Sequence, residues 1–200
     1  MNATSPTRLV DGRLVPAVGR WQVDPGHTLV GFEGRHLMIS RIRGSFRRFS
    51  GWLEMAEIPE ESQAELVVQA ASVESGFRDR DVHLRSADWF DADRYPVIRF
   101  VGKQIRHLDH SRWQSSGELT IRGITRTVDV TIEFEGGTTD PWGSQKIGAL
   151  ITATINREDY GMTWNMPLAT GGLVVSKDVQ ITIAVEAVRV ASEQASQAAA

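Results

Sequence analysis

Apolar and polar residues alternate along most of this sequence, and this alternation constrains the fold more than any other feature. In a β-strand successive side chains point to opposite faces, so a period of two predicts a strand with one buried and one exposed face. Apolar positions repeat in this way in about eight segments, which span residues 28–36, 49–55, 66–70, 98–100, 119–121, 128–134, 147–155 and 179–185. The pattern predicts an all-β fold, with an antiparallel barrel or a sandwich as its architecture.

Helical signals are sparse, and none has the period of about 3.6 residues that marks a long amphipathic helix. Short helical inserts are expected at residues 79–88, 36–40 and 157–160. Connections between strands are expected at Gly136-Gly137 and at 141–143, and Gly51 is interpreted as a bulge.

The chain has 200 residues, which fits one domain with short extensions. Residues 1–20 are expected to form an N-terminal extension, in which Asp11-Gly12 between two short apolar pairs predicts a small hairpin or an ordered strap. Residues 21–190 carry the strand pattern and are assigned to the barrel domain. Residues 191–200 are small, polar and low in complexity, so a flexible tail is expected there.

Composition excludes several classes of function. The net charge is -3, which argues against a strongly basic nucleic-acid binder, so no nucleic-acid partner is expected. The lack of cysteine removes disulfides, thiolate zinc sites and cysteine nucleophiles. The first 20 residues lack the apolar stretch of a secretory signal, so a cytoplasmic location is expected.

Small residues recur on the predicted inner faces of the strands. A barrel of about eight strands is just wide enough to be filled by side chains or to hold one small ligand. Small inward residues therefore leave two interpretations open, a ligand cavity or a tapered and fully packed interior. The positions are Gly34, Gly51, Ala70, Ala149 and Ala153.

The uncharged segment 160–176 contains Met162 and Trp164 without a strict strand pattern. An apolar segment without regular strand structure has to be shielded from water. The segment is therefore expected to form the lid of a pocket or a buried crossing loop.

Five separated blocks of sequence carry a more specific signal. They are WQVDPGHT at 21–28, RHLMIS and IRGSF within 35–46, RDVHLRSADWFD and YPVIRF within 80–100, GELTIRG at 117–123, and NREDYG at 156–161. In this order and spacing they resemble the YceI-like family, the polyisoprenoid-binding proteins of bacteria, over residues 21–190.

The resemblance implies a lipocalin-like antiparallel β-barrel with an elongated apolar pocket. It also implies a long isoprenoid ligand, such as a polyprenyl phosphate or the tail of an isoprenoid quinone. The family offers no catalytic motif to transfer, and no catalytic residue, metal or cofactor is expected. The residues expected to contact the ligand are Val30, Phe32, His36, Leu53, Leu66, Val68, Ile98, Phe100, Ile121, Val130, Ile132, Ile151, Met162, Trp164 and Ile183.

His36 is the polar member of that set. It is in phase with Val30 and Phe32, which places it on the inner face at the end of its strand. Two interpretations stay open: His36 donates a hydrogen bond to a phosphate or carbonyl head group, or it is a buried histidine satisfied by the backbone.

Two groups of polar residues have a structural interpretation as well as a functional one. Asp79, Asp81 and His83 alternate as metal ligands on a strand would, but on the expected helix they disperse. Arg41, Arg43 and Arg47 lie in a segment with no acidic residue. They are expected to share an outward face, either as a transient contact for a membrane surface or as a solvated strand edge.

The sequence thus predicts a non-catalytic protein that binds, sequesters or transports a long isoprenoid lipid in an apolar barrel cavity. Two alternatives stay open. One is an enzyme acting on an isoprenoid or quinone in the same cavity, with His36 as acid or base. The other is a packed barrel that serves as a protein-interaction module, with a homodimer as one form of it.

Overall fold

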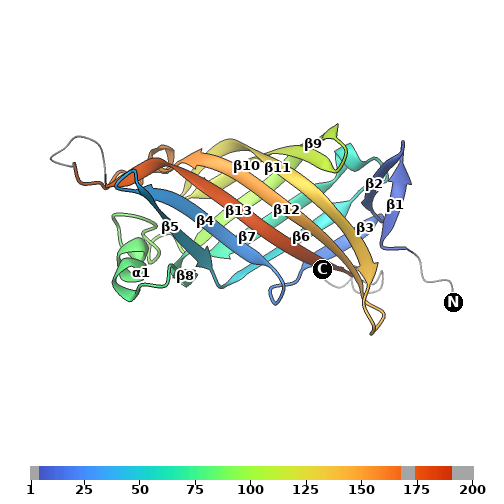
Figure 1. Ribbon diagram of the computed structural model, residues 1–200, viewed down its shortest axis with the longest axis horizontal. Coiled ribbons are helices and arrows are strands. Elements are labelled where there is room, and N and C mark those ends of the chain that lie inside the picture. The colour runs from blue at the N-terminus through green and yellow to red at the C-terminus, as the bar shows by residue number, and fades with distance from the viewer. Residues whose placement is uncertain (1–4, 168–173, 191–200) are drawn as a thin grey trace.

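Eight strands close on themselves as an antiparallel barrel in the computed structural model, which describes residues 5–167 and 174–190. The ring runs β12-β11-β10-β9-β7-β6-β3-β13, and pairing of β12 with β13 closes it (Figure 1). Its strands are β3 (Gly19–Val23), β6 (Phe49–Met55), β7 (Gln63–Gln69), β9 (Val97–Asp109), β10 (Arg112–Ile121), β11 (Ile124–Thr139), β12 (Gln145–Asn156) and β13 (Val175–Arg189).

Three further strands lengthen the barrel at one end. They are β4 (Leu29–His36), β5 (Ser40–Phe46) and β8 (Val73–Glu74), and they lie side by side after β13 in the order β4-β5-β8. β13 pairs with β3 through residues 187–189 and with β4 through residues 175–184, so β3 and β4 occupy one position in the ring. The turn at Asp24-Pro25-Gly26 separates the two strands. The result is an elongated barrel (Figure 1).

Different elements cover the two ends. At one end lie α1 (Arg78–Arg85) and β8, and at the other lies a hairpin of β1 (Thr7–Val10) and β2 (Arg13–Pro16) (Figure 1). Asp11 and Gly12, with φ of 50° and 76°, make the tight turn of this hairpin, a conformation that aspartate and glycine favour. The described residues also form three 3₁₀ helices, η1 (Pro59–Glu61), η2 (Ala70–Ser72) and η3 (Arg157–Tyr160).

Two groups of buried side chains flank the middle of the barrel. The larger includes Val30, Phe46 and Phe90 and lies toward α1. The smaller includes Trp21 and Phe134 and lies toward the hairpin. Trp21 is fully buried, and its indole N–H donates to the carbonyl of Ala17 at 2.9 Å, so this large ring has its polar atom satisfied.

The all-β barrel with short helical inserts is confirmed. The eight alternating segments coincide with strands, except that Thr28 precedes β4 and Ala70 lies in η2, and helical turns form at 78–85 and 157–160. The insert expected at 36–40 is wrong: Leu37 and Met38 adopt positive φ and make a tight turn between β4 and β5.

Two smaller expectations are also wrong. Gly136-Gly137 lies inside β11, at a register shift against β12, and is not a connection. Gly51 pairs in regular register with Leu66 and forms no bulge. The tail expected at 191–200 and residues 168–173 of the uncharged segment lie outside the described residues.

Gly117 provides a test of the packing inside the barrel. A Cβ at this position would lie 2.5 Å from Cζ of Phe100 and 2.6 Å from the carbonyl oxygen of Val101. Gly117→Ala is therefore expected to lower the free energy of unfolding by about 1–3 kcal/mol, measured by chemical denaturation.

Gly34→Ala is the matched control, because the nearest atom to its Cβ is the Ser176 hydroxyl at 3.7 Å. An equal loss in both variants would contradict the packing argument.

Candidate functional site

An apolar cavity of about 320 Å³ occupies the interior of the barrel. Its wall consists of inward side chains from the ring strands, and it includes members of both buried clusters. Polar side chains are rare in the wall: of the residues that line it, only Thr28, Glu65, Ser115 and Arg157 carry polar side-chain groups other than an indole N–H. Such a volume and lining suit one apolar ligand.

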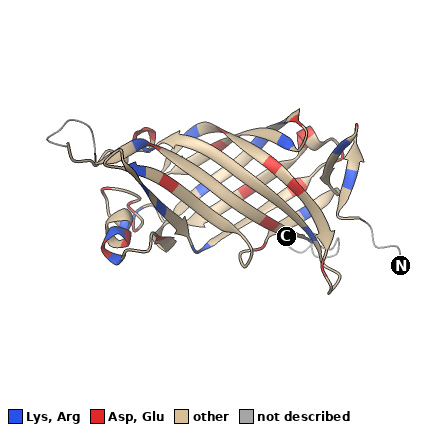
Figure 2. Ribbon diagram, in the orientation of Figure 1, with Lys and Arg blue, Asp and Glu red and all other residues tan. Residues whose placement is uncertain are grey.

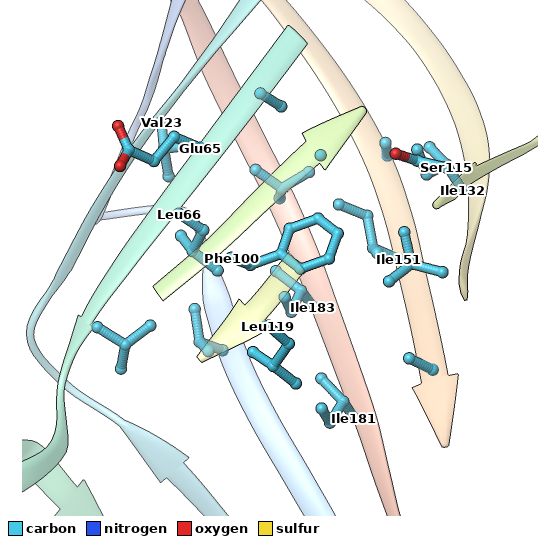
Figure 3. A pocket seen from close by; sticks show the side chains of 18 of the residues that line it. Val23, Glu65, Leu66, Phe100, Ser115, Leu119, Ile132, Ile151, Ile181 and Ile183 are labelled. Carbon is cyan, nitrogen blue, oxygen red and sulfur yellow. The ribbon is translucent and has the colours of Figure 1, made fainter. Parts of the chain in front are cut away.

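The structure brings together nearly all of the residues that the sequence assigned to ligand contact. All of them except His36 and Trp164 line the cavity. In Figure 3, Leu66, Phe100, Ile151 and Ile183 converge on the same space from β7, β9, β12 and β13. The cavity therefore follows from the alternation, although ligand contact at these residues stays a prediction.

His36 and Trp164 lie elsewhere. His36 is the half-buried last residue of β4, opposite Ser40 and Val175, and it is not among the residues that line the cavity. Trp164 packs on the Trp89 ring, with ring centroids 5.8 Å apart, and Trp89 lines the cavity. Trp164 therefore supports the wall from behind.

Small inward residues account for part of the free space. Ala149 and Ala153 of β12 line the cavity, whereas Gly34, Gly51 and Ala70 do not. A Cβ at Gly51 would lie 2.8 Å from the carbonyl oxygen of Glu65, so this glycine permits close strand contact and leaves no cavity.

The N-terminal hairpin forms one end wall of the cavity. Val15 and Pro16 of β2 line it, and Val15 is 1% exposed. Arg13 of the same strand donates to Glu60 at 2.8 Å, and its guanidinium lies 5.4 Å from the Trp113 ring centroid. Arg8 donates to the carbonyl of Ala56 at 2.6 Å. These contacts fix the hairpin against the barrel.

Aromatic side chains line the opposite end of the cavity. Phe46 lies 5.4 Å from Phe90 and 5.6 Å from Phe32, measured between ring centroids. All three line the cavity, as do Leu84 of α1 and Met162 after η3. Tilted and edge-on ring contacts of this kind add to the stabilisation from burial alone.

Two charged residues line the cavity, and of these only Glu65 is held in a direct ion pair among the described residues. The carboxylate of Glu65 accepts from Arg99 at 2.5 Å and from the Trp52 indole at 3.0 Å, and the Arg99 bond holds the pKa of Glu65 below its ordinary value. Arg157 is 1% exposed, and burial lowers its pKa. Periodicity did not reveal Arg157, because it lies on a 3₁₀ turn. The NREDYG block that contains it was the available signal.

Tyr160, at the other end of η3 from Arg157, also has a buried polar group. The Tyr160 hydroxyl has no hydrogen-bond partner among the described residues. Burial raises the pKa of Tyr160 to about 12, so the phenol stays protonated at neutral pH.

The alternating set on α1 is dispersed, as expected for a helix. Asp81 is buried, and its carboxylate accepts from the Ser75 backbone N–H at 2.7 Å. His83 instead pairs with Asp88 at 2.9 Å. These partners give both residues a local structural role.

Asp24, His27 and Glu186 also come together, with potential ligand atoms within 4.8 Å of one another. Lys146 lies 2.6 Å from Glu186 and 3.8 Å from Asp24, so its ammonium group supplies a positive charge shared by the two carboxylates. The hydrogen bond from His27 lowers the pKa of Asp24. The cluster acts as an ion-pair network that fixes the turn between β3 and β4.

The arginines of β5 and the adjoining turn have acidic partners. Glu33 on β4 pairs with Arg41 at 2.6 Å and Arg43 at 2.7 Å, and Arg47 pairs with Glu74. Charges of both signs are interspersed over the strands in Figure 2. This surface is therefore less positive than the segment of sequence alone indicates. No helix in the described parts of the chain is long and apolar enough to cross a membrane.

Comparisons with known proteins give one family. A model of the YceI-like domain matches residues 21–187. A UPF0312 protein of Staphylococcus aureus is 37% identical over 166 residues, which cover 82% of this chain and 94% of that protein.

Three solved structures are similar in fold. A YCEI protein of Campylobacter jejuni has a TM-score of 0.68 at 28% identity, covering 78% of this chain and 90% of that one. BcnA of Burkholderia cenocepacia has a TM-score of 0.69 at 22% identity, covering 82% and 98%. A polyisoprenoid binding domain from Saccharophagus degradans has a TM-score of 0.65 at 16% identity, covering 87% and 100%.

The end wall formed by the hairpin can be tested at Val15. Val15→Asp places a charge against the apolar cavity, so the variant is expected to lose at least about 2 kcal/mol of unfolding free energy and to bind more of a hydrophobic dye. Leu14→Asp is the control, because Leu14 is 46% exposed, and its change is expected within about 0.5 kcal/mol. Equal stability and dye binding in the two variants would show that the hairpin does not close the cavity.

Proposed function

Because the chain belongs to the YceI-like domain family, we propose that it binds a long isoprenoid lipid in the barrel cavity and sequesters or transports it. The proposed ligands are a polyprenyl phosphate or an isoprenoid quinone. The proposed ligand contacts are the residues that were predicted from the sequence and that also line the cavity, among them Phe32, Leu66, Phe100 and Ile183.

The observation that carries the proposal is the form of the cavity. It extends along an elongated barrel, from Leu84 and Phe90 at one end to Val15 and Pro16 at the other, and its wall is almost entirely apolar. A flexible hydrocarbon chain gains roughly 25 cal/mol for each Å² of apolar surface that it removes from water. A long, narrow apolar interior therefore favours a linear lipid over a compact polar metabolite.

The comparisons support the ligand class without naming a ligand for this chain. The Saccharophagus degradans domain, described as polyisoprenoid binding, shares the fold. We extend that ligand class to this protein because the same fold here encloses an apolar cavity.

We propose binding without catalysis because the described side chains that line the cavity offer no free acid–base group. A general acid–base site needs a titratable group in reach of the substrate. Glu65 is engaged by Arg99 and Trp52, and His36, the residue on which an enzyme would depend, does not line the cavity.

Contact with a membrane surface through Arg41, Arg43 and Arg47 stays a prediction, as does a homodimer. Glu33 and Glu74 already pair with these guanidinium groups, so any membrane contact would have to compete with existing ion pairs.

Ala153 offers a direct test of the cavity as the binding site. Ala153→Trp is expected to fill the space beside Ile181 and to weaken binding of a labelled polyprenol at least about tenfold, measured by fluorescence titration. The neighbouring Thr154 is exposed, so Thr154→Trp adds the same ring on the outer face and is expected to bind normally. Full binding by a folded Ala153→Trp protein would exclude the cavity as the site.

A further inference from the structure

Arg157 is a cation buried at the wall of an otherwise apolar cavity. It lies on η3, is 1% exposed, and is one of the residues that line the cavity. Its Nε donates to the carbonyl of Ser176 at 2.9 Å and its Nη1 donates to the carbonyl of Met162. These two bonds fix the plane of the guanidinium but bring no carboxylate into direct contact with it, although the nearby Glu158 attracts its charge at longer range.

No carboxylate among the described residues pairs with Arg157. The adjacent Glu158 pairs instead with Lys177 at 2.8 Å. The Trp89 ring, whose centroid is 4.9 Å from the guanidinium carbon, offers partial compensation through its π face. Nη2 is buried and has no hydrogen-bond partner.

A buried, unpaired charge is costly, and such groups in proteins are normally paired or bind an ion. Arginine stays protonated despite desolvation, so it cannot relieve the cost by losing its proton. A free Nη2 with a fixed guanidinium plane is well suited to an oxyanion, because phosphate accepts charge-assisted hydrogen bonds from this group.

The other polar side chains in the wall are already engaged. The Ser115 hydroxyl donates to the Lys103 carbonyl at 2.9 Å, and the Thr28 hydroxyl lies 3.2 Å from the Glu186 carbonyl oxygen. The Glu65 carboxylate is already paired with Arg99 and, as a hydrogen-bond acceptor, offers an anion no donor. The wall therefore offers an anion one positively charged site, and that site is Arg157.

We propose that Arg157 binds the anionic phosphate head group of the isoprenoid lipid through its free Nη2. The inference rests on the proposed function and deepens it, since it selects a phosphorylated isoprenoid over a neutral one. It also orients the ligand: the head group lies near Trp89 and Met162, and the hydrocarbon tail extends toward Val15 at the hairpin end.

A second arginine holds the surroundings of this site in place. Arg122 donates through Nη1 to the carbonyl of Trp89 at 2.8 Å and to the carbonyl of Gly161 at 3.1 Å. It is not among the residues that line the cavity. Arg122 therefore makes the same kind of backbone contacts as Arg157 without access to the ligand, which makes it a matched control.

The test compares two probes that differ only in the head group, geranylgeranyl phosphate and geranylgeraniol, by titration against the full-length protein. The wild type is expected to bind the phosphate at least about tenfold more tightly than the alcohol. Arg157→Met is expected to bind the alcohol within about twofold of the wild type and to lose the preference for phosphate. Arg122→Met is expected to keep the preference, because a purely structural change affects both probes alike.

The outcomes separate the two proposals. A wild type that binds the alcohol but shows no preference for phosphate, or an Arg157→Met protein that keeps the preference, would overturn the role of Arg157 and leave isoprenoid binding intact. A wild type that binds neither probe would remove the proposed function and this inference with it. If Arg157→Met fails to fold, Arg157→Lys replaces it, with a reduced phosphate preference as the expected result and an unchanged one as the contrary result.

Discussion

Closure of the sheet between β12 and β13 is the constraint on which the rest of the structure depends. The two strands pair without a register shift from Lys146 opposite Val188 to Asn156 opposite Asp178. Closure joins the two ends of the eight-stranded ring and forces its inward side chains into one shared interior. The alternating pattern then determines the chemistry of the interior: the inward residues are apolar, so the space that they enclose is apolar too.

The two ends of that space are chemically different. At the hairpin end the wall is formed by Val15, Pro16 and their apolar neighbours, and the nearby charges of Arg8 and Arg13 are held outside by partners. At the α1 end Arg157 is one of the lining residues, and its guanidinium lies near the Trp89 ring. An apolar interior with a cation at one end matches an amphiphile with a long tail and an anionic head. Binding of such a lipid therefore explains both the extent of the apolar wall and the position of Arg157 within it.

Much of the fold could be predicted from the sequence, because the signal repeats every two residues along strands such as β12 and β13. The same signal located most of the cavity wall. It failed at His36 for a reason other than phase: β4 keeps its register with β5 from Val30 to His36, so the alternation continues, but His36 is the last residue of β4 and lies beyond the part of the strand that lines the cavity. It could not identify Arg157, because a 3₁₀ turn has no strand period. Nor could it show that Glu33 pairs with Arg41 and Arg43, since that contact depends on which strands lie side by side.

The most direct test of the central claim is to identify what the native protein already contains. Mass spectrometry of organic extracts from the purified protein, beside native mass spectrometry of the intact complex, measures both the identity and the stoichiometry of a bound lipid. The account predicts a stoichiometric species whose mass follows a ladder of prenyl units. The absence of any co-purifying lipid, together with no binding of added polyprenyl phosphate or quinone, would contradict it.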